Sequence, residues 1–159
     1  MGMAEYEFAA EAVRVSDLVD YFGPRDVSLL ELAQKALGLE YPPTYRRFLR
    51  EFGAVAVGGT EFYGIIDSDF ASSGIPDSVW ATLSQREVAS LPDHLVIVGE
   101  TGMGEWYVLD TSKRDETGEC PVAIWSSWYS ENGGIEEVVA ADFGTYFWES
   151  LQREFGPRY

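Results

Sequence analysis

The segment LVIVGETGMGEWYVLD, residues 95–110, carries the clearest structural pattern in the chain. It opens with a short apolar run of leucine, valine and isoleucine, which is typical of a buried strand. It closes in EWYVLD, where Trp106 and Val108 alternate with Tyr107 and Leu109. Strict alternation of this kind predicts a second strand with two different faces.

The glycine-rich segment between these strands, GETGMG, is interpreted as a hairpin connection. It lacks the Lys-Ser/Thr pair of a phosphate-binding P-loop, and it carries Glu100, which would repel phosphate. A phosphate loop would also lead into a helix, whereas the residues that follow alternate as a strand. We therefore expect no phosphate site here.

A helix is expected before the hairpin, in YPPTYRRFLREFG, residues 41–53. Pro43 suits the first turn of a helix, because the N–H that proline lacks would be unpaired there anyway. The arginines of the segment lie off its apolar stripe, so one face should be buried. That stripe consists of Tyr45, Phe48, Leu49 and Phe52.

Further helices are expected from apolar periodicity. Ser28 and Glu31 match a capping box at the start of one helix, residues 76–90 predict another, and residues 141–155 form a clear amphipathic helix. Residues 4–22 also predict a helix. Its apolar stripe is Phe8, Ala12, Val15, Leu18, Val19 and Phe22.

Additional strands are predicted at residues 61–66 and 121–125. Helices, then mostly antiparallel strands, then a helix indicate an α+β fold with a central twisted sheet of about 4–6 strands. A chain of 159 residues suits one domain. We expect residues 1–159 to form it, with residues 1–25 as an N-terminal helical arm and residues 26–159 as its core.

The composition excludes several classes of protein. Apolar residues make up 46% of the chain, too many for a disordered acidic tail, and the net charge is −16. Nucleic acid and anionic membrane surfaces are not expected as partners, because they need lysine and arginine to neutralise phosphate. MGMAEYEF has no signal-peptide pattern, and no apolar run is long enough to span a membrane. We expect a cytoplasmic protein, with apolar surface that a second copy could cover to form a homodimer.

The negative charge is concentrated in the strand-rich part of the chain. Residues 61–149 hold 17 acids against three bases, Arg86, Lys113 and Arg114, a net charge of −14. Such an excess is often only a solvated surface. Its functional interpretation is a negative face that attracts a basic partner.

The sequence offers little for catalysis or cofactors. The single histidine, His94, precedes a buried strand, and the single cysteine, Cys120, precedes Pro121 at a strand start. Both are interpreted as structural residues. We expect no catalytic residues, no metal and no cofactor, since Asp67 and Asp69 are too closely spaced for an EF-hand loop. Paired carboxylates remain an alternative, but 27 acids give many chance pairs.

Three stretches together resemble the SUKH superfamily, which includes the yeast cell-wall-synthesis regulator of the Smi/Knr type and many bacterial immunity proteins. The resemblance covers about residues 28–155 and extends to a Bacillus antitoxin with similar Leu-Asp-Thr and Gly-Glu-Cys-Pro-Val strings. The second and third stretches are LVIVGETGMGEWYVLDTS and GECPVAIW, residues 95–112 and 118–125. The first is the entry motif, matched by Pro42, Tyr45, Phe48, Leu49 and Gly53.

The resemblance implies a non-enzymatic immunity protein that binds and neutralises a cognate toxin, often a nuclease. An acidic face that occludes the toxin's basic site would suit this role. Two alternatives stay open: a regulatory or scaffold module that binds another protein, and a small hydrolase that uses carboxylates.

The candidate partner-binding residues are acids in expected loops, together with aromatic anchors. Exposed tryptophan and tyrosine are favoured anchors at interfaces. Trp128 and Tyr129 lie in a Ser/Asn/Gly-rich segment that regular structure does not suit. The acidic candidates are Asp67, Asp69, Glu100, Glu105, Asp115, Glu116 and Glu131.

Overall fold

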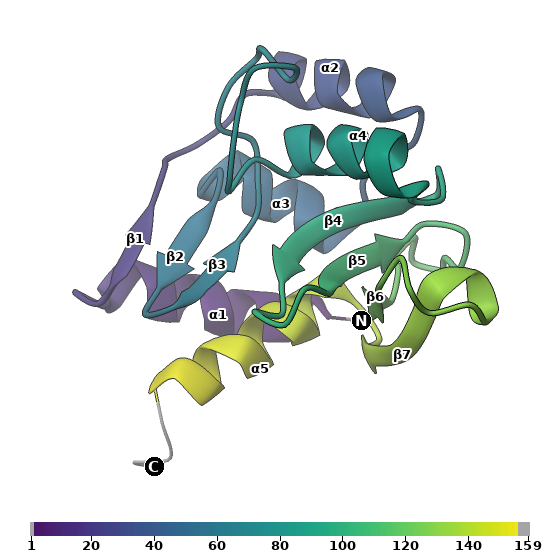
Figure 1. Ribbon diagram of the computed structural model, residues 1–159. Coiled ribbons are helices and arrows are strands. Elements are labelled where there is room, and N and C mark those ends of the chain that lie inside the picture. Colours follow the sequence, from purple (N-terminus) through teal and green to yellow (C-terminus); the bar gives the residue numbers. More distant parts are fainter. Residues whose placement is uncertain (1, 156–159) are drawn as a thin grey trace.

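The computed structural model describes residues 2–155; the other residues of the expected 1–159 domain lie outside the described part. Helices are interspersed with strands along the chain (Figure 1). The helices are α1 (Met3–Val15), α2 (Val27–Leu37), α3 (Pro43–Glu51), α4 (Ser78–Ala89), the short 3-10 helix η1 (Asn132–Gly134) and α5 (Phe143–Phe155). The strands are β1 (Val19–Tyr21), β2 (Val55–Val57), β3 (Thr60–Phe62), β4 (Leu95–Glu100), β5 (Trp106–Asp110), β6 (Val122–Trp125) and β7 (Ile135–Ala140).

The strands form two antiparallel sheets, one in the order β1-β2-β3 and one in the order β4-β5-β6-β7. The Tyr63 N–H donates to the Val98 carbonyl at 2.8 Å and joins the two sheets where β3 ends. In Figure 1, α2 and α4 lie on one side of the strands and α1 and α5 on the other. The expected α+β class with a C-terminal helix is confirmed, with the strands divided between two sheets.

The hairpin expected at residues 95–110 is present as β4 and β5. Val96 pairs with Leu109 and Glu100 with Trp106, and the Thr101 N–H donates to the Glu105 carbonyl at 3.1 Å across the turn. The register shifts by one residue between Ile97 and Gly99. This bulge lies beside Gly99, which is close to Tyr146 of α5, and it matters for the site described below.

The main core lies where α3 crosses α5. Phe48, which is fully buried, has ring centroids 5.0 Å from Phe143 and 5.2 Å from Phe147. The apolar stripe predicted for residues 41–53 is entirely buried, and Pro43 begins the helix as expected. A second apolar layer fills the space between α4 and the other face of the four-stranded sheet. It is formed by Tyr63, Ala81, Leu91, Leu95, Ile97, Val108, Ala123 and Trp125.

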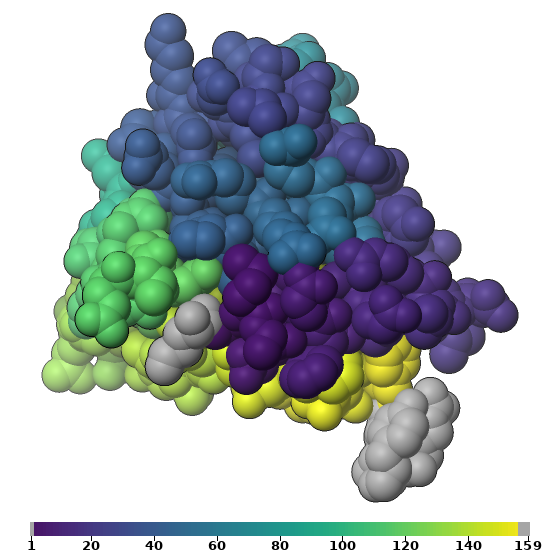
Figure 2. All heavy atoms as spheres, turned by 180° about the vertical axis from the view of Figure 1, so that it is seen from behind, coloured from purple at the N-terminus to yellow at the C-terminus, as the bar shows by residue number. Residues whose placement is uncertain are grey.

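The helix predicted for residues 4–22 is wrong in length and in its buried face. It ends at Val15, and residues 19–21 form β1. Figure 2 shows α1 lying across the back of the molecule against α5. A side chain at Gly144 of α5 would come within 2.2 Å of the Gly2 carbonyl, so small residues let the two helices approach closely. The buried residues are Tyr6, Ala9, Ala10 and Val13, whereas Phe8, Val15, Leu18 and Phe22 are exposed.

The start of α2 also differs from the prediction. Asp26, not Ser28, is the N-cap, and its carboxylate accepts the Leu29 N–H at 2.9 Å. The Ser28 hydroxyl donates to the same carboxylate at 2.8 Å. An aspartate at this position caps more directly than a serine two residues later, so the helix begins two residues earlier than the capping box implied.

Candidate functional site

A cleft opens between the β2–β3 hairpin, the β4–β5 turn and α5. Its volume is about 230 Å³. Three tyrosines form much of its wall, and three glutamates and one arginine add charge. The cleft is lined by Gly59, Thr60, Glu61, Tyr63, Glu100, Thr101, Gly102, Tyr107, Tyr146, Ser150, Arg153 and Glu154.

Two glycines allow the walls of this cleft to approach one another. A side chain at Gly99, next to the bulge in β4, would meet the Tyr146 hydroxyl at 3.0 Å. Gly58 has a φ of +57°, and a side chain there would lie 2.6 Å from the Glu154 carboxylate. Glu154 also accepts a hydrogen bond from the Thr60 hydroxyl, which ties the β2–β3 turn to α5 and closes one end of the cleft.

The cleft is electrically negative. Burial raises the pKa of Tyr63, and the nearby carboxylates of Glu100 and Glu61 raise it further. Burial likewise raises the pKa of Tyr146, so these phenols stay neutral at physiological pH. Among the described residues that line the cleft, Arg153 is the one cation, and it donates to the Ser150 hydroxyl at 3.1 Å.

A second hollow, of about 210 Å³, continues the cleft along α5 past Tyr107, Tyr146 and Arg153. It adds Val139 and Glu149 to the lining. Because both hollows share three residues, they form one groove beside the helix.

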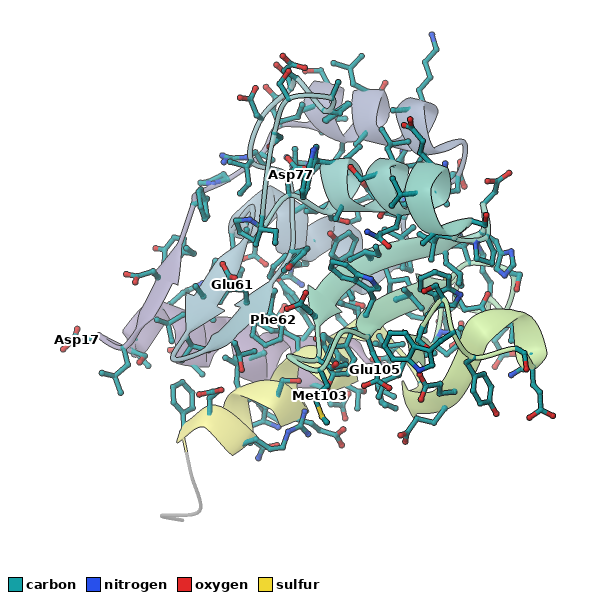
Figure 3. All side chains as sticks on the ribbon, in the orientation of Figure 1. Asp17, Glu61, Phe62, Asp77, Met103 and Glu105 are labelled. Carbon is teal, nitrogen blue, oxygen red and sulfur yellow. The ribbon has the colours of Figure 1, made fainter. Side chains whose placement is uncertain are left out.

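More carboxylates adjoin this groove at the edge of the four-stranded sheet. The Thr101 hydroxyl, in the cleft wall, donates to the Glu105 carboxylate at 3.2 Å. A hydrogen bond with the neighbouring Glu136 carboxyl raises the pKa of Glu105, and the negative charge of Glu137 raises it further. Figure 3 shows Glu105 at the β4–β5 turn beside α5, with Glu61 on β3. We define the acidic face as Glu61, Glu100, Glu105, Glu136, Glu137, Glu149 and Glu154.

Two large apolar side chains stand beside the acidic face. Met103, at the tip of the β4–β5 turn, is 81% exposed, and Trp128 is 63% exposed. The indole ring of Trp128 lies against Gly104, 3.3 Å from where a side chain would begin. A tryptophan held next to carboxylates but open to solvent is a suitable anchor for a protein partner.

The structure brings together three of the nine predicted site residues: Glu100, Glu105 and Trp128. Asp67 and Asp69 lie in the loop before α4, and the Asp67 carboxylate accepts the Asp69 N–H at 3.1 Å. These two acids are outside the groove.

Four further predicted residues lie in other loops. Asp115 and Glu116 belong to the β5–β6 loop, where the Thr117 hydroxyl and the Thr117 and Glu119 N–H groups donate to Asp115 and lower its pKa. Tyr129 and Glu131 lie in the β6–η1 loop that also carries Trp128. The Glu131 carbonyl accepts the Gly134 N–H at 2.9 Å, so its backbone shapes the turn.

Sequence reasoning missed most of the acidic face. Glu61 and Glu154 are 93 positions apart in the chain, and no local pattern connects them. Alternation along β5 correctly placed Tyr107 on the face opposite Trp106. It could not reveal that Tyr107 would meet Tyr146 of α5, with ring centroids 5.1 Å apart.

The histidine and the cysteine that were considered for catalysis lie away from the groove. Cys120 is buried, and burial raises the pKa of its thiol to about 11. His94 Nε2 is 3.8 Å from an oxygen of Asp110 at the opposite end of the hairpin. In residues 2–155 no group of three His, Cys, Asp or Glu side chains is arranged to hold a metal ion. Over the same residues, every helix is too short or too polar to cross a membrane.

Comparisons with known proteins identify the family and the fold of this chain. Residues 10–152 match the family model SUKH_5, described as SMI1-KNR4 cell-wall. The chain is also similar to a solved structure titled "Crystal structure of protein from Pseudomonas syringae pv. tomato", with a TM-score of 0.57 and 16% identity over 82% of this chain and 87% of that chain. No curated protein matches, and the narrower resemblance to a Bacillus antitoxin stays a prediction.

Proposed function

Because the chain belongs to the SMI1-KNR4 family of the SUKH superfamily, we propose that it is an immunity protein that neutralises a toxin by binding it. The family supports an immunity-type or SMI1/KNR4-like role. The toxin, its basic character and its nuclease activity are our proposal. So is a cytoplasmic place of action, where a toxin would meet its target.

One observation carries this proposal: the acidic face gathers seven glutamates from β3, β4, the β4–β5 turn, β7 and α5 around one groove. A nuclease must hold phosphates in a basic cleft, and a negative surface can cover that cleft. Opposite charges also speed encounter between two proteins, because they attract before contact. Rapid encounter suits a protein that must reach a toxin before damage occurs.

We propose that neutralisation needs no catalysis by this chain. A protonated, buried thiol at Cys120 is a poor nucleophile. The groove brings carboxylates together with tyrosines, which suits recognition of a cationic surface. A carboxylate-dependent hydrolase is the competing outcome, and turnover of a substrate that is lost with Glu100→Gln would favour it.

The test is co-expression with a basic toxin encoded beside this chain's gene. We expect the wild-type chain to keep the cells alive and to form a complex in gel filtration at low salt. The variant Glu105→Gln/Glu136→Gln/Glu137→Gln removes three charges from the acidic face, so protection should fall and association should slow. Raising the salt should slow association of the wild type in the same direction.

A matched control removes three charges elsewhere, in Asp67→Asn/Asp69→Asn/Glu116→Gln. We expect this control to protect cells as the wild type does, because these acids lie outside the groove. If both triple variants lost protection equally, the loss would reflect the total charge of the chain and not the acidic face. Cell death with the wild-type chain, together with no complex at low salt, would end the immunity proposal for that pair.

A second function is favoured by the family description itself, which refers to the cell wall. In this case the same groove would bind an endogenous regulatory protein. A complex with such a protein, lost in Glu105→Gln/Glu136→Gln/Glu137→Gln and kept in the control, would favour regulation over immunity.

A further inference from the structure

We propose that the tyrosine-lined cleft is a pocket for one arginine side chain of the partner protein. This deepens the proposed function, on which it rests, because it names the chemical group that the acidic face receives. The pocket residues are Tyr63, Tyr107 and Tyr146 on the wall and Glu61 and Glu100 at the rim.

Tyr146 provides the most specific observation. Its side chain is only 4% exposed, and its hydroxyl lies in the cleft wall beside Gly99. In residues 2–155 the fully buried hydroxyl without a partner is that of Tyr41, whereas the Tyr146 side chain lines the cleft and none of the side-chain hydrogen bonds described above involves its hydroxyl. A tyrosine hydroxyl that lines a cleft can donate to, or accept from, a group that enters the cleft.

The rim identifies the arriving group as a cation. Glu61 and Glu100 come from neighbouring strands of the two sheets, and both are near enough to Tyr63 to raise the pKa of its phenol. An anion between them would be repelled, and a neutral amide could donate hydrogen bonds but would leave the negative charge of both carboxylates uncompensated. A cation would satisfy both carboxylates and could also stack on the tyrosine faces.

Guanidinium fits these residues better than ammonium. It is planar, stacks on aromatic rings, and has five N–H donors that can bridge two carboxylates and a hydroxyl oxygen at once. A lysine offers three donors around a single point and is more strongly hydrated. A volume of about 230 Å³ accommodates a side chain of this size.

Arg153 lies at the edge of the same cleft and repels an incoming cation. It is exposed on the last turn of α5 and donates to Ser150, and its charge partly opposes the rise that burial causes in the pKa of Tyr146. Removing its charge should therefore tighten binding, whereas removing the rim carboxylates should weaken it. Opposite effects from two variants of one cleft are hard to obtain by unfolding.

The test uses the ¹⁵N-labelled full chain and a small probe, N-acetyl-arginine-methylamide, followed by NMR. We expect saturable shifts at the amides of Gly59, Thr101 and Gly102, weaker binding of the lysine analogue, and no shifts with the neutral citrulline analogue. Glu61→Gln/Glu100→Gln should weaken binding about tenfold, and Arg153→Gln should tighten it. Asp67→Asn/Asp69→Asn is the matched control and should bind as the wild type does.

The pocket would be overturned by no shifts at the cleft amides, by equal shifts with citrulline, or by equal affinity in the rim variant and its control. Lysine binding as tightly as arginine would also overturn it. These outcomes are separate from the partner complex. If the partner complex forms but the arginine analogue does not bind, the pocket is refuted and the proposed function is not. If the analogue binds but no partner complex forms, the proposed function is refuted and the pocket is not.

Discussion

Glu119 offers the sharpest test of the folding argument, because one buried carboxylate connects three elements. It is 2% exposed and lies just before β6. Its two oxygens accept the Thr44 N–H at 3.0 Å and the Thr44 hydroxyl at 2.9 Å, in the first turn of α3. The Thr44 hydroxyl oxygen accepts the Gly144 N–H of α5 at 3.1 Å.

Replacing Glu119 with alanine leaves two buried Thr44 groups without their acceptor. Each such group costs about 1–3 kcal/mol, so Glu119→Ala should lower the free energy of unfolding by about 2–6 kcal/mol. For a domain of this size that corresponds to a fall in Tm of about 4–24 °C. Glu116→Ala, three residues away and exposed, should stay within about 0.5 kcal/mol of the wild type.

Glutamine at position 119 tests the charge separately from the hydrogen bonds. Burial raises the pKa of the Glu119 carboxyl, so the folded chain holds this proton more tightly than the unfolded chain does. This tighter proton binding stabilises the folded chain. The stabilisation is fully present below the pKa of the carboxyl in the unfolded chain, about 4.3, and is lost as the pH rises through its pKa in the folded chain. Glu119→Gln removes this dependence, so its stability relative to the wild type should improve between about pH 4 and pH 7.

Urea unfolding followed by tryptophan fluorescence at both pH values measures these differences. The reasoning fails if Glu119→Ala costs no more than Glu116→Ala. It also fails if the gap between Glu119→Gln and the wild type stays constant with pH, because the buried charge would then contribute nothing.

Three further predictions follow from single side chains. Phe48→Ala should cost about 3–5 kcal/mol in urea unfolding, because it opens a cavity between α3 and α5, whereas Val15→Ala on the exposed face of α1 should stay within about 0.5 kcal/mol. Trp128→Ala should leave Tm nearly unchanged but weaken the partner complex at least about 30-fold by calorimetry; an unchanged Kd would show that the indole is no anchor. Cys120, whose thiol pKa is about 11, should react with Ellman's reagent only after unfolding, and rapid labelling of the native chain would contradict its burial.

The part of the fold that the sequence predicts is the part set by local pattern. In α3, the first-turn proline and four apolar residues at helical spacing agree with one another, and the structure confirms both. The alternation in residues 105–110 likewise separates Tyr107 and Leu109 from Trp106 and Val108, and these pairs join different cores. Local preference and burial favour the same arrangement in both segments.

In α1 two faces compete, and pattern alone favours the wrong one. Phe8 and Val15 are larger and more apolar than Ala9 and Ala10, so periodicity assigns them to the core. The α1–α5 contact instead needs small residues, because Gly144 brings the helices into close approach. Only the partner helix decides between the faces, and the partner lies more than 100 residues away in sequence.

The candidate site could not be predicted from the sequence for a related reason. Its residues belong to the core and to the surface at once. The rings of Tyr107 and Tyr146 pack together against the main apolar cluster, while the same side chains line the cleft. Tyr146 pairs with Phe62 at 5.8 Å, which fixes β3, and thus Glu61, relative to α5. The spacing of the rim carboxylates is therefore set by aromatic packing, so a volume change at Phe62 should alter cation binding even though this residue touches no ligand.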